Sequence, residues 1–340
     1  MKRSRAGLRT VVLIVLLPLA ASSAFLWYAF FGANRFAAGE QAVFFVSKGQ
    51  SFPSIVDSLE SRGLIRDRAL FVLVARLYGG TQRIQVGKYT FESGTSNADL
   101  YQSLRTGRGN SLLQVTVPEG YRSRTQARLF ARIIGIDTSR FVGLVHDRGF
   151  IRSLGIQDTS LEGYLLPDTY GFYWQQDEAD IIRRMVEQLQ GFYGDSLRER
   201  QEQMGWTMKQ VLTFASIVEG EAVLDEERAI IAGVYHNRLR RGIKLEADPT
   251  IQFILRDGPR RLLYADLRLD NPYNTYRYPG LPPGPVNNPG RASILATLYP
   301  VNHNYLFFVA NGHGGHWFSS TYEEHVRRVK SYRRLRAMVS

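Results

Sequence analysis

Residues 207–221 read TMKQVLTFASIVEGE, and they carry the clearest structural pattern in the chain. Apolar residues recur there at intervals of three and four, at Val211, Phe214, Ala215 and Val218. This spacing predicts an α-helix with one apolar face. At 100° per residue, Glu221 projects within about 20° of the direction of Phe214. The pattern therefore predicts that the Glu221 carboxyl group lies on the apolar face, provided that Gly220 does not end the helix.

Two glutamates at the end of this stretch are candidate catalytic residues. A carboxyl group held against an apolar wall has a raised pKa and can donate a proton near neutral pH. The departure of a glycosidic oxygen needs such an acid. Glu221 is the stronger candidate, because Glu219 is in line with Leu212, toward the edge of the apolar face. The alternative is that both glutamates are solvated acids at a helix end.

The region after this helix combines a second helix with many turn-forming residues. Asp225 is the expected N-cap of the second helix. Residues 246–290 are rich in Gly and Pro and also hold Asn, Thr, Tyr and Asp side chains. Rigid loops of this kind suit the wall of a cleft better than a core. A strand is predicted at residues 305–310, and a capping box at residues 321–324 opens a C-terminal helix.

Residues 43–110 are predicted to form a small βα module. Residues 44–46 indicate a strand, the apolar spacing of residues 55–59 indicates a helix, and residues 87–91 indicate a return strand. The run V-x-x-G-Q-S-F that begins at Val46 resembles the start of a LysM-like module, the small glycan-binding unit of cell-wall proteins. An ordinary strand–turn–helix unit is the alternative.

The N-terminal segment is predicted to span a membrane. Residues 11–31 form a run of 21 residues without a charge, VVLIVLLPLAASSAFLWYAFF, and about 20 apolar residues cross the hydrocarbon core as a helix. Four basic residues in the tail 1–10, against Arg35 shortly after the span, predict a cytoplasmic N-terminus. The rest of the chain then lies on the periplasmic or extracellular side of the plasma (inner) membrane. The alternative is a cleaved signal peptide, which the length of the apolar run disfavours.

The composition excludes several other classes of protein. The 340 residues include no cysteine, which excludes a disulfide framework, a thiolate metal site and a cysteine nucleophile. Most of the net charge of +12 lies at the two ends of the chain, so it does not form the basic groove that nucleic acid requires. His313 and His316 lack an evident third ligand, so no metal is expected. Motifs of serine hydrolases and nucleotide-binding loops do not occur, and no organic cofactor is expected.

An ordered set of short motifs resembles one family, the membrane-anchored endolytic murein transglycosylases of the MltG or YceG type. The order and spacing of the motifs, rather than any single one, carry the resemblance. The motifs are LEGYLLPDTY (161–170), ASIVEGE (215–221), NRL (237–239), LEADPT (245–250), YNTY (273–276), GLPPGP (280–285), NPG (288–290) and GGH (314–316). Two departures from the family pattern, Gly220 and Glu246, leave Glu221 unaffected.

The resemblance implies an α+β protein with a single N-terminal transmembrane helix, the LysM-like module and a mixed α/β catalytic domain of residues 111–340. It also implies a lytic cut of the MurNAc–GlcNAc bond within peptidoglycan strands, which leaves a 1,6-anhydro-MurNAc end. Glu221 is the implied acid/base. The implied partners are peptidoglycan glycan strands and peptidoglycan synthases (penicillin-binding proteins). The substrate-binding candidates are Glu162, Glu219, Asp248, Thr250, Tyr273, Asn274, Tyr276 and His316.

Two other functions remain open at this point. A hydrolytic muramidase normally uses two carboxylates, and Glu219, Asp248 or Glu162 are the candidate partners of Glu221. A membrane-anchored wall-binding protein without catalytic activity would need only the LysM-like module and the aromatic loops.

Overall fold

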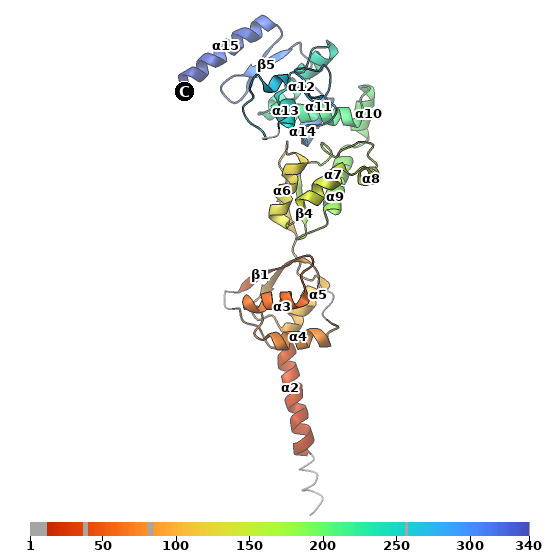
Figure 1. Cartoon of the computed structure of the whole chain (residues 1–340), viewed down its shortest axis with the longest axis vertical. Helices are drawn as coiled ribbons and strands as arrows, with labels where there is room; N and C mark the ends of the chain where they lie inside the picture. The colour runs from red at the N-terminus through yellow and green to blue at the C-terminus, as the bar shows by residue number, and fades with distance from the viewer. Residues whose placement is uncertain (1–11, 37–39, 81–83, 256–257, 340) are drawn as a thin grey trace, which may run out of the picture. The chain divides into compact units, whose positions relative to one another are not determined.

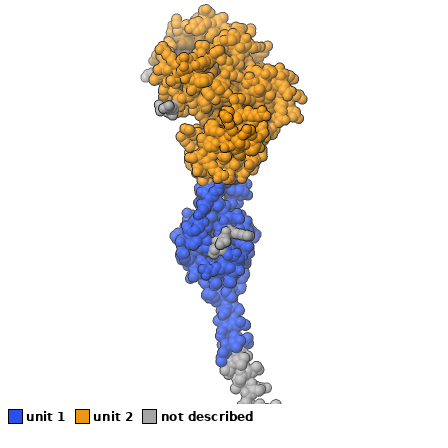
Figure 2. Space-filling model, turned by 45° about the vertical axis from the view of Figure 1, so that its right-hand side comes forward, with its two compact units in different colours: residues 1–113, 171–176 blue, residues 114–170, 177–340 orange. Residues whose placement is uncertain are grey.

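The computed structural model describes residues 12–36, 40–80, 84–255 and 258–339, which form a mixed α/β protein (Figure 1). The chain divides into two compact units, one of residues 1–113 with 171–176 and one of residues 114–170 with 177–340 (Figure 2). Among the described residues, the strands form three separate two-stranded sheets, so helices supply most of the core. This confirms the mixed α/β class. The predicted domain limits at 43–110 and 111–340 stay predictions.

The N-terminal apolar segment is helical. A π-helical stretch, Val12–Leu16, continues into α2, Leu17–Phe31. The part from Ile14 to Phe31 is long and apolar enough to cross a membrane, and only 6% of it is buried. Both a membrane anchor and a signal sequence have these properties. Residue 11 and the basic tail 1–10 lie outside the described residues.

The last turn of α2 packs on the rest of unit 1. Ala29 is fully buried and packs with Val74 and Ala98. The Asn97 side-chain amide donates a hydrogen bond of 2.9 Å to the Ala29 carbonyl oxygen. The apolar helix is therefore docked at its C-terminal end on the module that follows it.

Unit 1 contains the module predicted from residues 43–110. Strands β1 and β2 pair antiparallel, with Gln41 opposite Glu92 and Val46 opposite Gly87, which confirms the predicted strand and return strand. Three helices cover the pair and bury a core around Phe44. The elements are β1 (Gln41–Val46), α3 (Phe52–Ser61), α4 (Arg68–Leu77), β2 (Gly87–Glu92) and α5 (Asn97–Thr106).

The first part of unit 2 is mainly helical. Strand β3 pairs with β4 in a two-stranded sheet. The aromatic rings of Phe130 on α6 and Phe141 on α7 lie 5.7 Å apart and join these helices. The elements are β3 (Leu113–Thr116), α6 (Ser123–Ile134), α7 (Thr138–His146), α8 (Arg148–Ser153), β4 (Thr169–Phe172), α9 (Glu178–Phe192) and α10 (Asp195–Gln203).

The second part of unit 2 is built around α11, Met208–Glu221. This confirms the predicted helix, which runs through Gly220 to Glu221. The expectation of one apolar face was too narrow, because every residue from Val211 to Val218 is buried. Helices α12, α13 and α14 all pack against α11 and cover it on several sides. These helices are α12 (Asp225–Arg240), α13 (Asp248–Ile254) and α14 (Arg291–Leu298), with a 3₁₀ turn at Asp266–Arg268.

Two local predictions in this region need correction. The N-cap of α12 is Leu224, whereas Asp225 lies in the first turn and accepts a hydrogen bond of 2.9 Å from Arg228 Nε. The predicted strand 305–310 begins at Phe307, and the glycine-rich segment after it is the turn of a hairpin that returns as a second strand. The elements are β5 (Phe307–Ala310), β6 (His316–Ser319) and α15 (Tyr322–Val339).

Candidate active site

Glu221 lies in a cavity of about 320 Å³ in unit 2. Helix α11 contributes Glu221, α12 contributes Tyr235 and Arg238, and the start of α13 contributes Asp248. The hairpin β5–β6 and helix α15 complete the lining. The cavity thus collects side chains from segments more than 100 residues apart in the sequence, from Glu221 to His325.

The Glu221 carboxyl group is held by two donors on one oxygen. Its Oε1 accepts a hydrogen bond of 3.0 Å from the Tyr235 hydroxyl and one of 3.2 Å from the Asp248 backbone N–H. Burial, and then the negative charge of Asp248, raise the pKa of Glu221 from the ordinary 4.5 to about 7. The group is therefore able to exchange a proton near neutral pH.

Gly220 allows α13 to approach α11 at this point. A Cβ atom at Gly220 would lie 2.5 Å from Cγ of Pro249, well inside the distance that real Cβ contacts show. Pro249 follows Asp248, whose N–H contacts Glu221. The glycine between the two glutamates therefore has a structural reason in this chain, which is the close approach of the residue pair 248–249.

Arg238 fixes the segment that precedes Asp248. Its Nη1 donates hydrogen bonds of 2.9 Å to the carbonyl oxygens of Lys244 and Leu245. The same nitrogen lies 3.0 Å from Glu246 Oε2. Glu246 has a φ of 53°, a left-handed conformation that is uncommon for a residue with a Cβ atom. The buried guanidinium thus holds a strained turn in place beside the cavity.

His316, which also lines the cavity, is paired with Glu227. Its Nδ1 lies 2.6 Å from Glu227 Oε2, and its backbone N–H donates to Glu227 Oε1 at 2.8 Å. Because the Glu227 carboxylate can only accept a hydrogen bond, His316 Nδ1 carries the hydrogen of this contact. The other ring nitrogen, Nε2, takes no part in the pair. Gly315 permits this pairing, since a Cβ atom there would lie 2.6 Å from Glu227 Oε1.

Glu219 has a different environment from Glu221. Its Oε1 accepts from Arg228 Nη1 at 3.0 Å, and its Oε2 accepts from Gly290 N–H at 3.0 Å and from the Ser293 hydroxyl at 2.8 Å. Its side chain is only 5% exposed. All these partners are permanent parts of the fold, so Glu219 joins α11, α12 and α14 instead of lining the cavity around Glu221.

The remaining predicted site residues fall into two groups. Thr250 and Asn274 are fully buried, and they bond to the chain around them: Thr250 Oγ1 donates to Ala247 O at 2.7 Å, and Asn274 Nδ2 donates to Leu269 O at 2.7 Å. Glu162 and Tyr273 line a different, larger cavity. The structure therefore brings together Glu221, Asp248, Tyr276 and His316, with the Tyr276 hydroxyl donating to Asp248 Oδ1 at 2.5 Å.

Sequence reasoning missed Tyr235 and gave Arg238 no role. Tyr235 lies four residues after Ile231, on the buried side of α12, and only 2% of it is exposed. A polar hydroxyl at such a core position was the available signal, because a buried phenol needs a hydrogen-bond partner.

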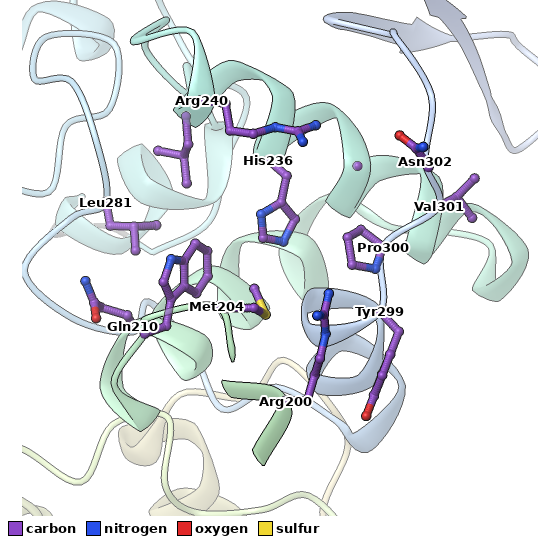
Figure 3. Close-up of a pocket in the computed structure, with 13 residues that line it drawn as sticks. Arg200, Met204, Gln210, His236, Arg240, Leu281, Tyr299, Pro300, Val301 and Asn302 are labelled. Atoms are coloured by element: carbon purple, nitrogen blue, oxygen red, sulfur yellow. The ribbon is translucent and has the colours of Figure 1, made fainter. Parts of the chain in front are cut away.

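A separate cavity of about 1010 Å³ lies beside His236, the residue of α12 that follows Tyr235 (Figure 3). His236 borders it, stacked on Trp206 at 5.1 Å, and the guanidinium of Arg200 lies over the Tyr299 ring at 5.6 Å. Its lining within the described residues holds no carboxyl group, so it lacks the acid that defines the first cavity. Across residues 12–36, 40–80, 84–255 and 258–339, no cluster of three or more His, Asp or Glu side chains is suited to a metal ion.

A carboxyl group whose pKa is raised to about 7 by burial, set in a polar cavity, is characteristic of an acid/base enzyme site. The chain matches the model of the YceG-like family over residues 44–331 and belongs to that family.

Proteins from several bacteria are similar to this chain. A Bacillus subtilis (strain 168) protein named endolytic murein transglycosylase is 31% identical over 302 residues, which cover 84% of this chain and 83% of that protein. A Streptococcus pneumoniae (strain R6) protein with the same name is 27% identical over 321 residues, which cover 84% of this chain and 57% of that protein. The crystal structure of a yceG-like protein from Listeria monocytogenes matches with a TM-score of 0.61 and 28% identity, covering 85% of this chain and 98% of that one.

Proposed function

We propose that this protein is an endolytic peptidoglycan lytic transglycosylase, a lyase that uses Glu221 as its acid/base. Its relatives are named endolytic murein transglycosylases, which supports an enzyme over a wall-binding protein without activity and supports peptidoglycan as the substrate class. The observation that carries the proposal is the buried Glu221 carboxyl group, whose pKa is raised to about 7 by burial and by the charge of Asp248.

The proposed reaction needs one acid/base because the substrate supplies the nucleophile. Glu221 gives its proton to the glycosidic oxygen as the bond from that oxygen to MurNAc C1 breaks. The MurNAc C6 hydroxyl oxygen then bonds to C1, and its proton passes to Glu221. The products are a GlcNAc-ended fragment and a 1,6-anhydro-MurNAc end. No water is consumed, and Glu221 is protonated again for the next cycle.

The hydrogen bonds at Glu221 suggest which oxygen reacts. Oε1 already accepts from the Tyr235 hydroxyl and from the Asp248 N–H. In the proposal Oε2 therefore carries the proton, and the two donors keep the carboxyl plane fixed. Asp248, Tyr276 and His316 contact the sugar beside Glu221. Glu219, Thr250 and Asn274 act as supports, and Glu162 and Tyr273 act in the neighbouring cavity.

One observation favours a second candidate, the hydrolytic muramidase. Asp248 shares the cavity with Glu221, so a carboxylate is available there to activate a water molecule. The other two candidate partners are engaged elsewhere: Glu219 is bound by Arg228 and Ser293, and Glu162 by Ser123 and Asn288. Asp248 is therefore the partner that a hydrolytic mechanism would use.

Product analysis distinguishes the two reactions. The protein from residue 32 onward is incubated with uncrosslinked glycan strands in the presence of EDTA, and the fragments are reduced with borohydride and weighed by mass spectrometry. We expect anhydro-ended fragments from internal cuts, with no mass gain and no reduction, because the C6 hydroxyl closes onto C1. Reducible MurNAc ends, each heavier by one water, as the main product would instead establish the muramidase.

The rate is expected to fall as the pH rises through about 7. The first step needs the protonated form of Glu221, whose pKa is raised to about 7 by burial first and by the Asp248 charge second. The Asp248→Asn variant removes the second cause, so the alkaline limb of kcat/KM should move to lower pH. Initial rates between about pH 5 and 9 measure this. The control is Asp195→Asn on the exposed start of α10, which should leave the limb in place.

We also propose that the apolar helix is retained as a single-pass anchor with a cytoplasmic N-terminus, and that unit 1 acts as a LysM-like glycan-binding module beside the peptidoglycan synthases. The asymmetry of basic residues around the span supports this orientation. Protease added to spheroplasts should remove a C-terminal tag and spare an N-terminal one. Protection of the C-terminal tag in sealed cells would contradict the orientation, and a mature form that begins near Phe25 would indicate a signal peptide.

A further inference from the structure

The cavity lined by Glu162 and Tyr273 contains motif residues that the proposed reaction does not use. It has a volume of about 1300 Å³ and is lined by Glu162 and Tyr273 together with residues of α6 and of the proline-rich segment 283–285. Glu162 supports its wall, accepting from the Ser123 hydroxyl at 2.7 Å and from the Asn288 amide at 2.9 Å. The predicted site residues that line a cavity are thus divided between this cavity and the one around Glu221.

Three separate segments run from this cavity to the one around Glu221. Helix α11 has Lys209 in the large cavity and Glu221 in the small one. Helix α13 has Phe253 in the large cavity and Asp248 in the small one, which is about 8 Å along a helix axis.

The third segment is the loop that follows the 3₁₀ turn. Its Tyr273 lines the large cavity and its Tyr276 lines the small one. Because three independent segments connect them, the two cavities are neighbours within one unit.

The charges of the large cavity are only partly compensated. Lys209 Nζ pairs with Asp158 at 2.9 Å. The Arg122 guanidinium lies over the Phe253 ring at 5.0 Å and donates to the Phe253 carbonyl oxygen at 3.2 Å.

Two further cations face the same cavity from α6. Arg124 and Arg128 are four residues apart and exposed, so they lie on one face of the helix. Neither has an acidic partner within 4 Å among the described residues. The cavity therefore offers two unpaired guanidinium groups beside apolar walls that include Phe253 and Pro283.

We infer that this cavity binds the stem peptide of the glycan strand, with Arg124 and Arg128 on the peptide carboxylates. The inference rests on the proposed function. A stem peptide is attached to the same MurNAc residue whose bond is cut, so it must lie close to the catalytic cavity. Guanidinium groups bind carboxylates, and the apolar and backbone groups of a peptide suit the mixed walls.

Kinetics on two substrates test the inference. The substrates are uncrosslinked strands with intact stem peptides and the same strands freed of peptide by an amidase. We expect a KM about tenfold lower for the peptide-bearing strands, since one decade corresponds to about 1.4 kcal/mol. The double variant Arg124→Gln/Arg128→Gln should raise this KM about tenfold, with little change in kcat and no change for peptide-free strands.

The matched control is Arg132→Gln, which removes the same charge from an exposed site one turn further along α6, outside the cavity. It should leave both KM values unchanged. A competition experiment distinguishes binding of a peptide from binding of any anion. A free stem tripeptide should inhibit the cleavage of peptide-bearing strands, and inorganic phosphate at equal concentration should not.

Equal KM values of the wild type for both substrates, or inhibition by phosphate alone, would overturn the inference while leaving the proposed function intact. Failure of the wild type to cut either substrate would overturn both.

Discussion

Replacing Glu221 with Gln is expected to lower turnover of uncrosslinked glycan strands by at least about 10²-fold, the usual effect of losing an acid/base group. The amide keeps the shape of the side chain and has no proton to give. Both donors to Oε1, the Tyr235 hydroxyl and the Asp248 N–H, still find an acceptor in the amide oxygen. The measurement is the rate of new chain ends by mass spectrometry.

Two control variants define the origin of the loss. Glu226→Gln changes an exposed glutamate of α12 and should leave turnover unaltered. Glu219→Gln should lower turnover less than Glu221→Gln does, because Glu219 is bound to Arg228 and Ser293 and does not line the cavity. An inactive Glu219→Gln protein beside an active Glu221→Gln protein would reverse the assignment.

The same Glu221→Gln variant should be more stable than the wild type at alkaline pH. The pKa of Glu221 rises from 4.5 when unfolded to about 7 when folded, so ionisation favours the unfolded chain. Between these two pH values the wild type loses roughly 3 kcal/mol of unfolding free energy, which the variant keeps. Urea unfolding should show this difference at about pH 8 and none at about pH 4. A variant that is less stable at pH 8 would mean that Glu221 is ionised and satisfied in the fold.

Replacing Arg228 with Met is expected to destabilise the protein by about 3–5 kcal/mol, the cost of leaving a buried charge without its partner. Only 10% of the Arg228 side chain and 5% of the Glu219 side chain are exposed. Arg228 also bonds to the Ser293 hydroxyl and lies 3.5 Å from Glu119. The pKa of Glu119 is already raised, by burial and by the charge of Glu219, so loss of the cation should raise it further.

Urea unfolding at neutral pH measures this effect. The control is Arg241→Met, at the exposed C-cap of α12, which should change the unfolding free energy by less than about 0.5 kcal/mol. Adding Glu219→Gln to Arg228→Met should recover part of the loss, because the buried negative charge is then removed as well. If Arg228→Met unfolds at the same urea concentration as the wild type, the ion-pair cluster does not stabilise the fold.

Much of the fold follows from local patterns in the sequence. Apolar spacing predicted α11, since a period of three to four residues reflects the geometry of one helix, and short apolar runs next to turn residues predicted β1 and β2. The same geometry placed the Glu221 carboxyl group on a packed face. The apolar run at residues 11–31 likewise predicted a helix able to cross a membrane, which the structure contains from Ile14 to Phe31.

Contacts between distant parts of the chain determine features of the fold that the periodicity of apolar residues does not show. Local spacing could not tell that α11 is covered on several sides, because α12, α13 and α14 come from later parts of the chain. It also did not predict the strand β6, whose pairing partner is β5 across a glycine-rich turn. For the same reason the motif GGH did not indicate that His316 is a strand residue paired with Glu227.

The candidate site shows the same division. The sequence by itself determined that Glu221 ends an apolar helix and that the chain carries the ordered motifs of one family. Only the tertiary structure decided that Glu219 is bound by Arg228 and that Tyr235 and the Asp248 N–H hold Glu221. It also decided which of the predicted site residues line the cavity around Glu221 and which line the larger one. The physical reason is that a pKa and a hydrogen bond depend on groups brought close in space, and the partners of Glu221 lie 14 and 27 residues away along the chain.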